Sequence, residues 1–357
     1  MNETPSGLPA GCSLVPFDPA TATADEWARF HAFRHLRHAE RRPEDPIRPD
    51  ADIEVLIRRP EPGGATRRWL ALDGDAIVGT LTTNWVVDGP MLATNGHLLQ
   101  ASAAVLGPAR RRGIGTALAR VAAREMAALD RTVLTTGTEE DDGRRFLESL
   151  GATCKMEASE NRLDLREVDW SMVETWAAEG PRRSPDTAFL VWRDRVPPGE
   201  LPVYSAALSR LLNMMPKDDL DQGDIVLTPE MMAEFQSRID AMHGALDTMV
   251  TRETDGAISG MTDVMYTPGQ PDRIMQQFTG VDPKHRGRGL GKWLKAAMLL
   301  HVREAYPQAC WVVTGNANSN DPMLSINHRL GFIAYRGESV YQIDRDALAA
   351  RLAQRPM

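Results

Sequence analysis

A basic, glycine-rich loop occurs twice in this chain, and no other feature of the sequence limits its fold as strongly. The first copy covers residues 104–115 and the second residues 280–291. They align without a gap, with Arg286 lying 176 positions after Arg110. Each loop follows a strand-like run and precedes apolar residues at helical spacing. The repeated unit is therefore a strand, a loop and a helix, used twice.

A second correspondence lies downstream of each loop. Residues 146–152 and 327–332 both predict the end of a helix at a Leu-Gly pair, with glycine just beyond the last turn. Gly331 lies 180 positions after Gly151, close to the offset between the loops. Short apolar and β-branched runs predict the surrounding strands. These strands are residues 98–105, 132–136, 154–165, 274–281, 310–314 and 333–343.

The duplication predicts two domains, residues 10–170 and residues 190–350, with a boundary near 170–190. The chain has 357 residues, which is enough for two cores of ordinary size. Segments 179–187 and 195–202 are rich in proline, glycine and charge, and we interpret them as linker or surface loop. Each domain should hold a mixed central sheet flanked by helices, so the predicted fold class is α/β or α+β.

Composition excludes several classes of partner. The net charge of -8 and the pI near 5.6 give no basic field for nucleic acid or an anionic membrane. Cys12, Cys154 and Cys310 lack metal-ligand spacing, so we expect no zinc site and no disulfide framework. No apolar run has the length of a membrane span, and Met1–Ala10 lacks the pattern of a signal peptide. We therefore expect a soluble cytoplasmic protein without a metal, whose oligomeric state stays open.

The loop pattern Arg-x-x-Gly-x-Gly has the geometry of an anion site. Its backbone N–H groups converge at a helix N-terminus, and its glycines let phosphate oxygens approach the backbone. A diphosphate suits such a loop. A Rossmann site would need a third glycine and an acidic residue downstream, and a Walker A loop would need Lys followed by Ser or Thr. A single loop could be a basic turn that caps a helix, but two aligned copies argue against that interpretation.

The string Val281–Gly291 resembles motif A of the GNAT (Gcn5-related N-acetyltransferase) superfamily, in which such a loop holds the pyrophosphate of coenzyme A. The asparagine cluster at 316–320, with Leu330-Gly331-Phe332, is similar to motif B of that superfamily. The resemblance covers about residues 65–165 and 245–345. The two-copy layout is similar to that of tandem members such as mycothiol synthase.

The resemblance implies acetyl-CoA as the acyl donor and a set of coenzyme-binding residues. It also implies that the backbone N–H of Val281, or of Val105, polarises the thioester carbonyl. In the second copy the coenzyme-binding residues are Val281, Arg286, Gly287, Arg288, Gly289, Leu290, Gly291, Lys292 and Asn320. In the first copy they are Val105, Arg110, Arg112, Gly113 and Gly115.

The general acid departs from the family pattern. The family often has a tyrosine four residues before the glycine of Leu-Gly-Phe, and this chain has Asn327 there. Neither Asn327 nor Leu147 of the first copy can donate a proton as a phenol does. His328 is a substitute in sequence, as are Tyr335 and Tyr341, although a histidine on such a helix is commonly just solvated. The acid is left unassigned.

The general base also departs from the pattern. Gln276 and Gln277 lie on the strand where many family members have a glutamate. The nearest carboxylates are Asp263, on the strand predicted at 258–266, and Glu253, just before the predicted hairpin at Asp255-Gly256. We predict Asp263 as the first candidate for accepting a proton or binding the amine. A solvent-facing strand residue is the alternative interpretation.

The first copy is predicted to be degenerate or a scaffold. Its residues 139–142 read Glu-Glu-Asp-Asp where the second copy has its asparagines, and four carboxylates would repel coenzyme phosphates. Alternatively, this run is an ordinary exposed loop. The C-terminal copy, which keeps the full basic glycine pattern, is the one predicted to be catalytic.

These observations favour an N-acyltransferase that moves acetyl from acetyl-CoA to a primary amine of a small molecule by direct attack in a ternary complex. A non-catalytic acyl-CoA-binding or regulatory protein is the alternative, because the family's tyrosine and glutamate are missing. A purely structural role is a third. The aspartates of residues 218–224 could favour a cationic acceptor or form a solvated loop.

Overall fold

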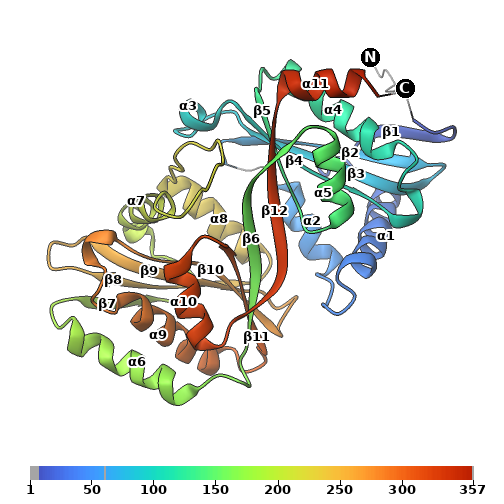
Figure 1. The fold of residues 1–357 in the computed structure, drawn as a ribbon. Helices are drawn as coiled ribbons and strands as arrows, with labels where there is room; N and C mark the ends of the chain where they lie inside the picture. Colours follow the sequence, from blue (N-terminus) through green and yellow to red (C-terminus); the bar gives the residue numbers. More distant parts are fainter. Residues whose placement is uncertain (1–7, 60–61, 356–357) are drawn as a thin grey trace. The chain divides into compact units, whose positions relative to one another are not determined.

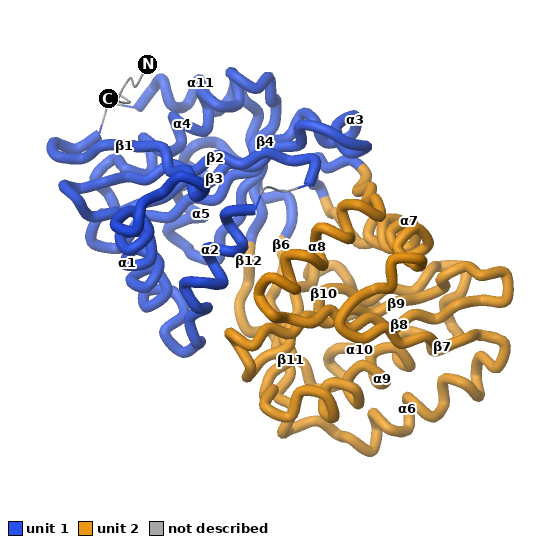
Figure 2. The backbone as a smooth tube through the Cα atoms, turned by 180° about the vertical axis from the view of Figure 1, so that it is seen from behind, with its two compact units in different colours: residues 1–156, 219–223, 339–357 blue, residues 157–218, 224–338 orange. Residues whose placement is uncertain are grey.

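The computed structural model describes residues 8–59 and 62–355. The chain divides into two compact units, coloured separately in Figure 2. Unit 1 draws its described residues from Met1–Met156, Asp219–Gly223 and Ser339–Met357, and unit 2 from Glu157–Asp218 and Asp224–Glu338. Each unit holds one copy of the glycine-rich loop.

Unit 1 is built on a mixed sheet with the strand order β1-β2-β3-β4-β5-β12 (Figure 1). Strands β4 and β5 run parallel, whereas β1 to β4 are joined antiparallel. The strands are β1 (Cys12–Pro16), β2 (Gly64–Asp73), β3 (Ala76–Val86), β4 (Leu98–Val105), β5 (Val133–Thr138) and β12 (Ile333–Asp344). The helices are α1 (Ala24–Arg41), α2 (Asp50–Arg58), α3 (Leu92–Asn95), α4 (Ile114–Ala128), α5 (Asp141–Ser149) and α11 (Arg345–Ala353).

Two apolar clusters hold the faces of this sheet. Leu70 and Ala71 are neighbours on β2, so their side chains point to opposite faces. Ala71 packs in the cluster that contains buried residues of α4 and α11, and Leu70 packs in the cluster that contains Trp27 of α1. The sheet is therefore covered on both faces, as an α/β fold requires.

Unit 2 repeats this plan with the strand order β6-β11-β10-β9-β8-β7. Strands β10 and β11 run parallel, and the other described pairs are antiparallel. The strands are β6 (Thr153–Asp164), β7 (Ala188–Trp192), β8 (Ala245–Arg252), β9 (Ile258–Tyr266), β10 (Arg273–Val281) and β11 (Trp311–Ala317). The helices are α6 (Trp170–Arg183), α7 (Leu201–Leu212), α8 (Pro229–Ala241), α9 (Leu290–Ala305) and α10 (Asp321–Leu330).

Helices cover both faces of the second sheet as well. Met249 of β8 packs in a cluster with buried residues of α6 and α9, whereas its neighbour Val250 packs with residues of α7 and α8. Figure 1 shows α7 and α8 on one side of β7–β11 and α6 and α9 on the other. The predicted mixed sheets flanked by helices are confirmed for both units.

Strands β6 and β12 each begin in one unit and end in the other. The later part of β12 pairs with β5, from Ser339 opposite Thr138 to Asp344 opposite Val133. Residues Ala158–Asp164 of β6 pair with β11 in unit 2. Each sheet thus takes one strand from the other copy of the repeat, and the compact units differ in this respect from the ranges 10–170 and 190–350.

One segment interpreted as linker is partly helical. Helix α6 continues to Arg183, so residues 179–183 belong to it. Gly180 is required there for space rather than for flexibility, because a Cβ at this position would lie 2.1 Å from the Trp293 ring. The interpretation of residues 179–183 as linker was wrong. A helix that packs closely on α9 needs a glycine there, and a stretch with such a composition reads like a loop in the sequence.

Candidate functional site

Both glycine-rich loops adopt the same backbone conformation. Gly287 and Gly289 have left-handed φ angles of 80° and 83°, and Gly289 is the N-cap of α9. The positions 176 residues earlier, Arg111 and Gly113, have φ angles of 62° and 89°. Each loop therefore turns from the end of a strand into the start of a helix with two left-handed residues. Such a turn directs consecutive backbone N–H groups toward one point.

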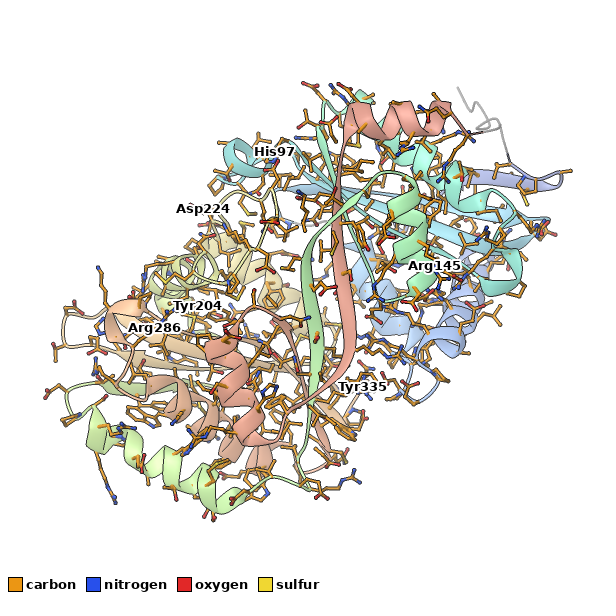
Figure 3. The ribbon with its side chains drawn as sticks, in the orientation of Figure 1. His97, Arg145, Tyr204, Asp224, Arg286 and Tyr335 are labelled. Atoms are coloured by element: carbon orange, nitrogen blue, oxygen red, sulfur yellow. The ribbon has the colours of Figure 1, made fainter. Side chains whose placement is uncertain are left out.

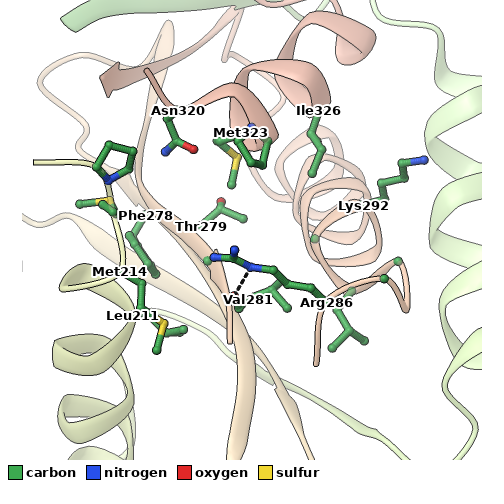
Figure 4. Close-up of a pocket in the computed structure, with 18 of the residues that line it drawn as sticks. Leu211, Met214, Phe278, Thr279, Val281, Arg286, Lys292, Asn320, Met323 and Ile326 are labelled. Carbon is green, nitrogen blue, oxygen red and sulfur yellow. Dashed lines mark hydrogen bonds between the residues drawn. The ribbon is translucent and has the colours of Figure 1, made fainter. Parts of the chain in front are cut away.

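A cavity of about 420 Å³ lies over the loop of unit 2 (Figure 4). Eight of the nine coenzyme-binding residues predicted for this copy line it. They are Val281, Arg286, Gly287, Gly289, Leu290, Gly291, Lys292 and Asn320. A Cβ on Gly291 would lie 3.3 Å from Ile326 Cδ1, so glycine here keeps the cavity open between α9 and α10. The basic loop and the start of α10 are thus brought to one place.

The ninth predicted residue, Arg288, has a different role. Its guanidinium donates hydrogen bonds to the Glu253 carboxylate, at 3.0 Å, and to the Thr187 hydroxyl. Burial would raise the pKa of Glu253, but hydrogen bonds from Ser259 and Arg288 together with the positive charge of Arg288 hold that pKa below its usual value. Glu253, one of the predicted catalytic residues, is therefore an ionised partner of the loop, and it does not line the cavity.

Sequence reasoning missed the apolar end of the cavity and one basic residue. Leu211 of α7 and Met214, which follows that helix, face Phe278 of β10 there, as Figure 4 shows. Arg183, the last residue of α6, also lines the cavity. None of these residues lies in a recognisable motif, and their contribution comes from the packing of α6 and α7 against the repeated unit.

Strand β10 is bulged beside the cavity. Its register with β9 shifts between Gln276 and Phe278, and its parallel ladder with β11 covers Arg273 to Met275 in the described register. Gln276 is buried in the bulge, where its amide nitrogen donates to Thr262 Oγ1 at 2.8 Å and its amide oxygen accepts from Lys295 Nζ at 3.2 Å. The bulge directs the residues from Phe278 onward along the cavity wall.

Asp263 lies in the core rather than on a solvent-facing strand. It is 2% exposed, and its Oδ2 accepts a hydrogen bond from Tyr204 of α7 at 3.0 Å (Figure 3 labels Tyr204). Burial raises the pKa of Asp263 to about 6, although hydrogen bonds from Thr248 and Tyr204 oppose the shift. Asp263 does not line the cavity, but its cross-strand neighbour Phe278 does.

The two candidates on α10 differ in environment. Asn327 is buried and donates a hydrogen bond to Asn316 Oδ1 at 2.9 Å, while its own Oδ1 has no partner among the described residues. His328 is exposed. Neither lines the cavity, which instead takes Met323 and Ile326 from the same helix. Helical spacing places His328 away from Met323 and Ile326, whereas Asn327 is turned into the core, where it binds Asn316.

A second cavity, of about 590 Å³, lies over the loop of unit 1. The predicted residues Val105, Arg110, Gly113 and Gly115 line it, and Arg112 does not. Arg112 instead pairs with Asp73 at 2.7 Å, just as Arg288 pairs with Glu253 in unit 2. The middle basic residue of each loop is therefore held by a carboxylate at the preceding hairpin.

The acidic run of unit 1 is neutralised by arginines. Every one of its carboxylates has an arginine partner: Glu139 pairs with Arg41 and Arg42, Glu140 with Arg37 and Arg110, Asp141 with Arg144, and Asp142 with Arg145 and Arg110. Simple repulsion of phosphates by four free carboxylates is therefore the wrong reason to regard this copy as degenerate. The relevant effect is that Arg110 is already paired, at 2.9 Å with Glu140.

The aspartates of the segment 218–224 do not reach the cavity of unit 2. Asp218 accepts a hydrogen bond from Ser319 at 2.6 Å, Asp221 pairs with His97 at 3.0 Å, and Asp224 pairs with Lys217 at 3.3 Å. Residues 219–223 belong to unit 1. The hypothesis that this segment selects a cationic acceptor at that cavity is therefore not supported.

The described residues offer neither a metal centre nor a helix that could cross a membrane. Within them, no group of three or more His, Cys, Asp or Glu side chains is arranged to hold a metal ion. Across residues 8–59 and 62–355, no helix combines the length and the apolar character needed to cross a bilayer.

The first copy matches a known family in sequence, and the whole chain resembles solved structures in fold. A family model described as acetyltransferase (GNAT) family matches residues 30–152. No curated protein matches the chain. A solved tandem GNAT protein from the clavulanic acid biosynthesis pathway is 23% identical with a TM-score of 0.74, over 94% of this chain and 98% of the other.

Two further solved structures share the fold at lower identity. A GCN5-related N-acetyltransferase from Sphaerobacter thermophilus is 13% identical with a TM-score of 0.63, over 95% of this chain and 97% of the other. A fungal multi-domain β-N-acetylglucosaminidase has a glucosamine N-acetyltransferase region that is 13% identical with a TM-score of 0.64. The alignment covers 94% of this chain and 38% of that protein. These likenesses show that the whole chain shares the fold of these proteins.

Proposed function

We propose that this chain, in which residues 30–152 match the GNAT acetyltransferase family and which has the fold of a solved tandem GNAT protein, is an N-acetyltransferase that transfers an acetyl group from acetyl-CoA to a primary amine of a small molecule. We further propose that the cavity of unit 2, in the C-terminal copy, is the working site. The reaction takes place in the cytoplasm, by direct attack of the amine within a ternary complex.

This proposal rests on whether the first arginine of each loop, Arg286 or Arg110, is already paired with a carboxylate. In unit 2, Arg286 lines the cavity and has no carboxylate partner among the described residues; its Nε donates to the Val281 carbonyl at 3.4 Å. Figure 4 shows its guanidinium extending across the cavity toward Thr279. In unit 1 the equivalent Arg110 is paired with Glu140 and Asp142. An unpaired guanidinium beside a glycine cradle is available to a diphosphate, whereas a paired one must first be released.

One replacement between the two copies accounts for the different pairing of Arg286 and Arg110. Asn320 stands 180 positions after Glu140, and both residues line their cavities. A neutral amide at this position leaves Arg286 free, whereas a carboxylate at this position binds Arg110. The same replacement supports placing coenzyme phosphates at the second loop.

The chemistry needs few side chains. The amine nitrogen attacks the thioester carbonyl carbon, a C–N bond forms, the C–S bond breaks to release coenzyme A as its thiolate, and the amine loses one proton. The described residues that line the cavity of unit 2 include no carboxylate, imidazole or phenol. We propose that water accepts the proton, that the Val281 backbone N–H polarises the carbonyl, and that alignment of amine and thioester supplies most of the rate.

Two observations favour the opposite allocation of roles. The family model matches residues 30–152, which contain the first loop and not the second. The cavity of unit 1 is also larger, at about 590 Å³ against about 420 Å³. A second candidate function is therefore acetyl transfer in unit 1, with the coenzyme displacing Glu140 from Arg110.

Calorimetric titration with acetyl-CoA and free coenzyme A tests the allocation. The wild type is compared with two matched double variants, Gly289→Glu/Gly291→Glu and Gly113→Glu/Gly115→Glu. Loss of binding in the first variant alone supports unit 2 as the coenzyme site. Loss in the second variant alone reverses the allocation, and no binding by the wild type rejects the acyltransferase proposal.

Release of free thiol from acetyl-CoA, measured with a panel of primary amines, separates catalysis from binding. The panel includes amino sugars, polyamines and amino-acid-derived amines. Thiol release that depends on one class of amine, and that is lost in the 289/291 variant, supports the proposed reaction. Coenzyme binding without thiol release by any amine would favour the non-catalytic alternative.

A further inference from the structure

Three cationic side chains gather beside the glycine-rich loop of unit 2, each from a different helix. Arg183 ends α6, Lys292 lies in the first turn of α9, and Arg329 lies in the last turn of α10. Lys292 Nζ and Arg329 Cζ lie 5.2 Å and 4.8 Å from the centre of the Trp176 ring. We call these three residues the cation cluster.

The cluster adjoins the cradle for the diphosphate. A Cβ placed on Gly289 would lie 3.3 Å from the guanidinium Nη1 of Arg183. Lys292 follows Gly291 directly, and Figure 4 shows its side chain leaving the loop toward α6. A phosphate held by the cluster would therefore lie next to a diphosphate held by the loop, at a different set of cations from Arg286.

The charges of the cluster are poorly balanced within the described residues. Arg183 has one carboxylate near it, Glu179, at 3.9 Å. Neither Lys292 nor Arg329 has an ion pair in the described part of unit 2. Desolvation, together with the positive charges of Arg329 and Arg183, lowers the pKa of Lys292. Like charges held together in this way favour an added anion.

Unit 1 places a cation at the same point by other means. The positions that correspond to Lys292 and Arg329 along the repeat are Thr116 and Ser149, and both line the cavity of unit 1. Arg355, from beyond α11, donates hydrogen bonds to both hydroxyls, at 3.4 Å and 2.5 Å. Positive charge therefore recurs at this point in both copies although none of the residues is the same, which indicates a ligand requirement rather than a chance surface charge.

We propose that the cation cluster binds the 3′-phosphate of coenzyme A and makes the site of unit 2 selective for the 3′-phosphorylated coenzyme. This inference rests on the proposed function of that site. A phosphate monoester carries nearly two negative charges at neutral pH, and three cations on three helices can surround it. In coenzyme A one ribose carries both the 3′-phosphate and the diphosphate, so the two anions lie close together. This explains why two groups of cations are neighbours in unit 2. Trp176, buried beneath Lys292 and Arg329, holds two of the three side chains in place.

The test compares coenzyme A with 3′-dephospho-coenzyme A by calorimetry. All titrations use the full chain with Gly113→Glu/Gly115→Glu, so that unit 2 alone is titrated. Charge-assisted contacts to one phosphate predict that coenzyme A binds on the order of tenfold more tightly than the dephospho form. The variant Arg183→Ala/Arg329→Ala should lose this preference while keeping its affinity for the dephospho form. Arg182→Ala, which removes an adjacent exposed arginine from the same helix, is the matched control and should keep the preference.

Each other outcome has a definite meaning. Equal affinity for the two coenzymes, or an Arg183→Ala/Arg329→Ala variant that weakens both equally, would overturn the phosphate assignment and leave the proposed function intact. An equal loss of preference in Arg182→Ala would show a diffuse charge effect and would also overturn it. Binding of neither coenzyme in this background, with unchanged thermal unfolding, would reject both the cluster and the assignment of unit 2 as the coenzyme site.

Discussion

Two ionisable side chains of unit 2 are buried where their charged forms are poorly solvated. Asp263 and Lys295 are each 2% exposed. Burial raises the pKa of Asp263 to about 6 and lowers the pKa of Lys295 to about 7. Burial in the native state disfavours the charged form of each group. Each group therefore lowers the free energy of unfolding at any pH at which it would be charged in the unfolded chain. Neither lines the cavity, so their energetic effect is on folding first.

The change Asp263→Asn should raise stability above pH 6 and change it little near pH 4. The native pKa is about 6 against an ordinary value of 3.8, so the native state binds the proton more tightly than the unfolded state. The contribution of Asp263 to stability is then most favourable below pH 4 and becomes less favourable as pH rises toward 6. The shift corresponds to roughly 3 kcal/mol, which the amide avoids while it still accepts from Tyr204. Urea unfolding at several pH values measures this.

The same variant separates a structural Asp263 from a proton acceptor in catalysis. If Asp263 accepts the proton, Asp263→Asn removes the acid limb of the pH profile of kcat/KM near pH 6. If water accepts the proton, kcat/KM is kept and only the stability profile changes. Equal destabilisation by the variant at pH 4 and pH 8 would contradict the burial argument itself.

The change Arg111→Gly should stabilise the first loop by up to about 1 kcal/mol. Arg111 has a φ of 62°, which costs a side chain with a Cβ more than glycine, and part of this gain is offset by the entropy of glycine in the unfolded chain. The matched control is Gly287→Ala at the equivalent position, with a φ of 80°, which should be destabilising. Thermal unfolding gives both values, and stabilisation by both changes would refute the argument.

At the scale of elements, each glycine-rich loop is braced against the hairpin that precedes its strand. Arg288 pairs with Glu253 beyond β8, and Arg112 pairs with Asp73 at the end of β2. In each antiparallel ladder the start of one strand pairs with the end of the next, β9 with β10 and β3 with β4. The hairpin before the first strand and the loop after the second therefore lie at the same end of the ladder. The braces therefore hold the cradle in shape without contacting its ligand.

Glu253→Gln should weaken coenzyme binding at unit 2 roughly fivefold, because a partly buried ion pair that orders the loop is worth about 1 kcal/mol. Calorimetry of Glu253→Gln, Arg288→Gln and the double variant measures it. The double variant should be no weaker than either single one, since both remove the same pair. Asp73→Asn is the matched control. It should leave coenzyme binding at unit 2 unchanged, because Asp73 pairs with Arg112 in the loop of unit 1. Additive losses would place Arg288 on the coenzyme instead.

At the scale of the whole molecule, the two halves of the sequence are not independent folding units. Unit 1 requires residues 339–357, and unit 2 requires the part of β6 that begins at Glu157. An N-terminal fragment ending before α6 would keep a strand that belongs to unit 2 and lack the strand that pairs with β5. Its sheet would end in an unpaired edge.

Fragments 1–168 and 169–357 expressed separately should therefore aggregate or remain unfolded, because each lacks one strand of its sheet. Expressed together they should form a soluble complex that binds coenzyme, since the exchanged strands can then pair. Size-exclusion chromatography and circular dichroism measure both results. A monomeric 1–168 fragment with a cooperative unfolding transition would contradict the exchange.

Local signals in the sequence determined the elements of this protein and its glycine-rich loops. Strands such as Ile258–Tyr266, the hairpin at Asp255-Gly256 and the glycine that ends α10 depend on alternation, turn chemistry and left-handed conformation within a few residues. The duplication itself was visible for the same reason. Most of the predicted coenzyme residues line a cavity because a short loop places all of them together.

Tertiary packing decided the rest, because it depends on residues far apart in the chain. No local pattern shows that Arg288 is held by Glu253 or that Asp263 is buried under α7. Nor does any show that Arg110 is paired with Glu140 while Arg286 has no carboxylate partner among the described residues. The composition of the two units likewise depends on which strands pair, and pairing is set by long-range burial rather than by order in sequence.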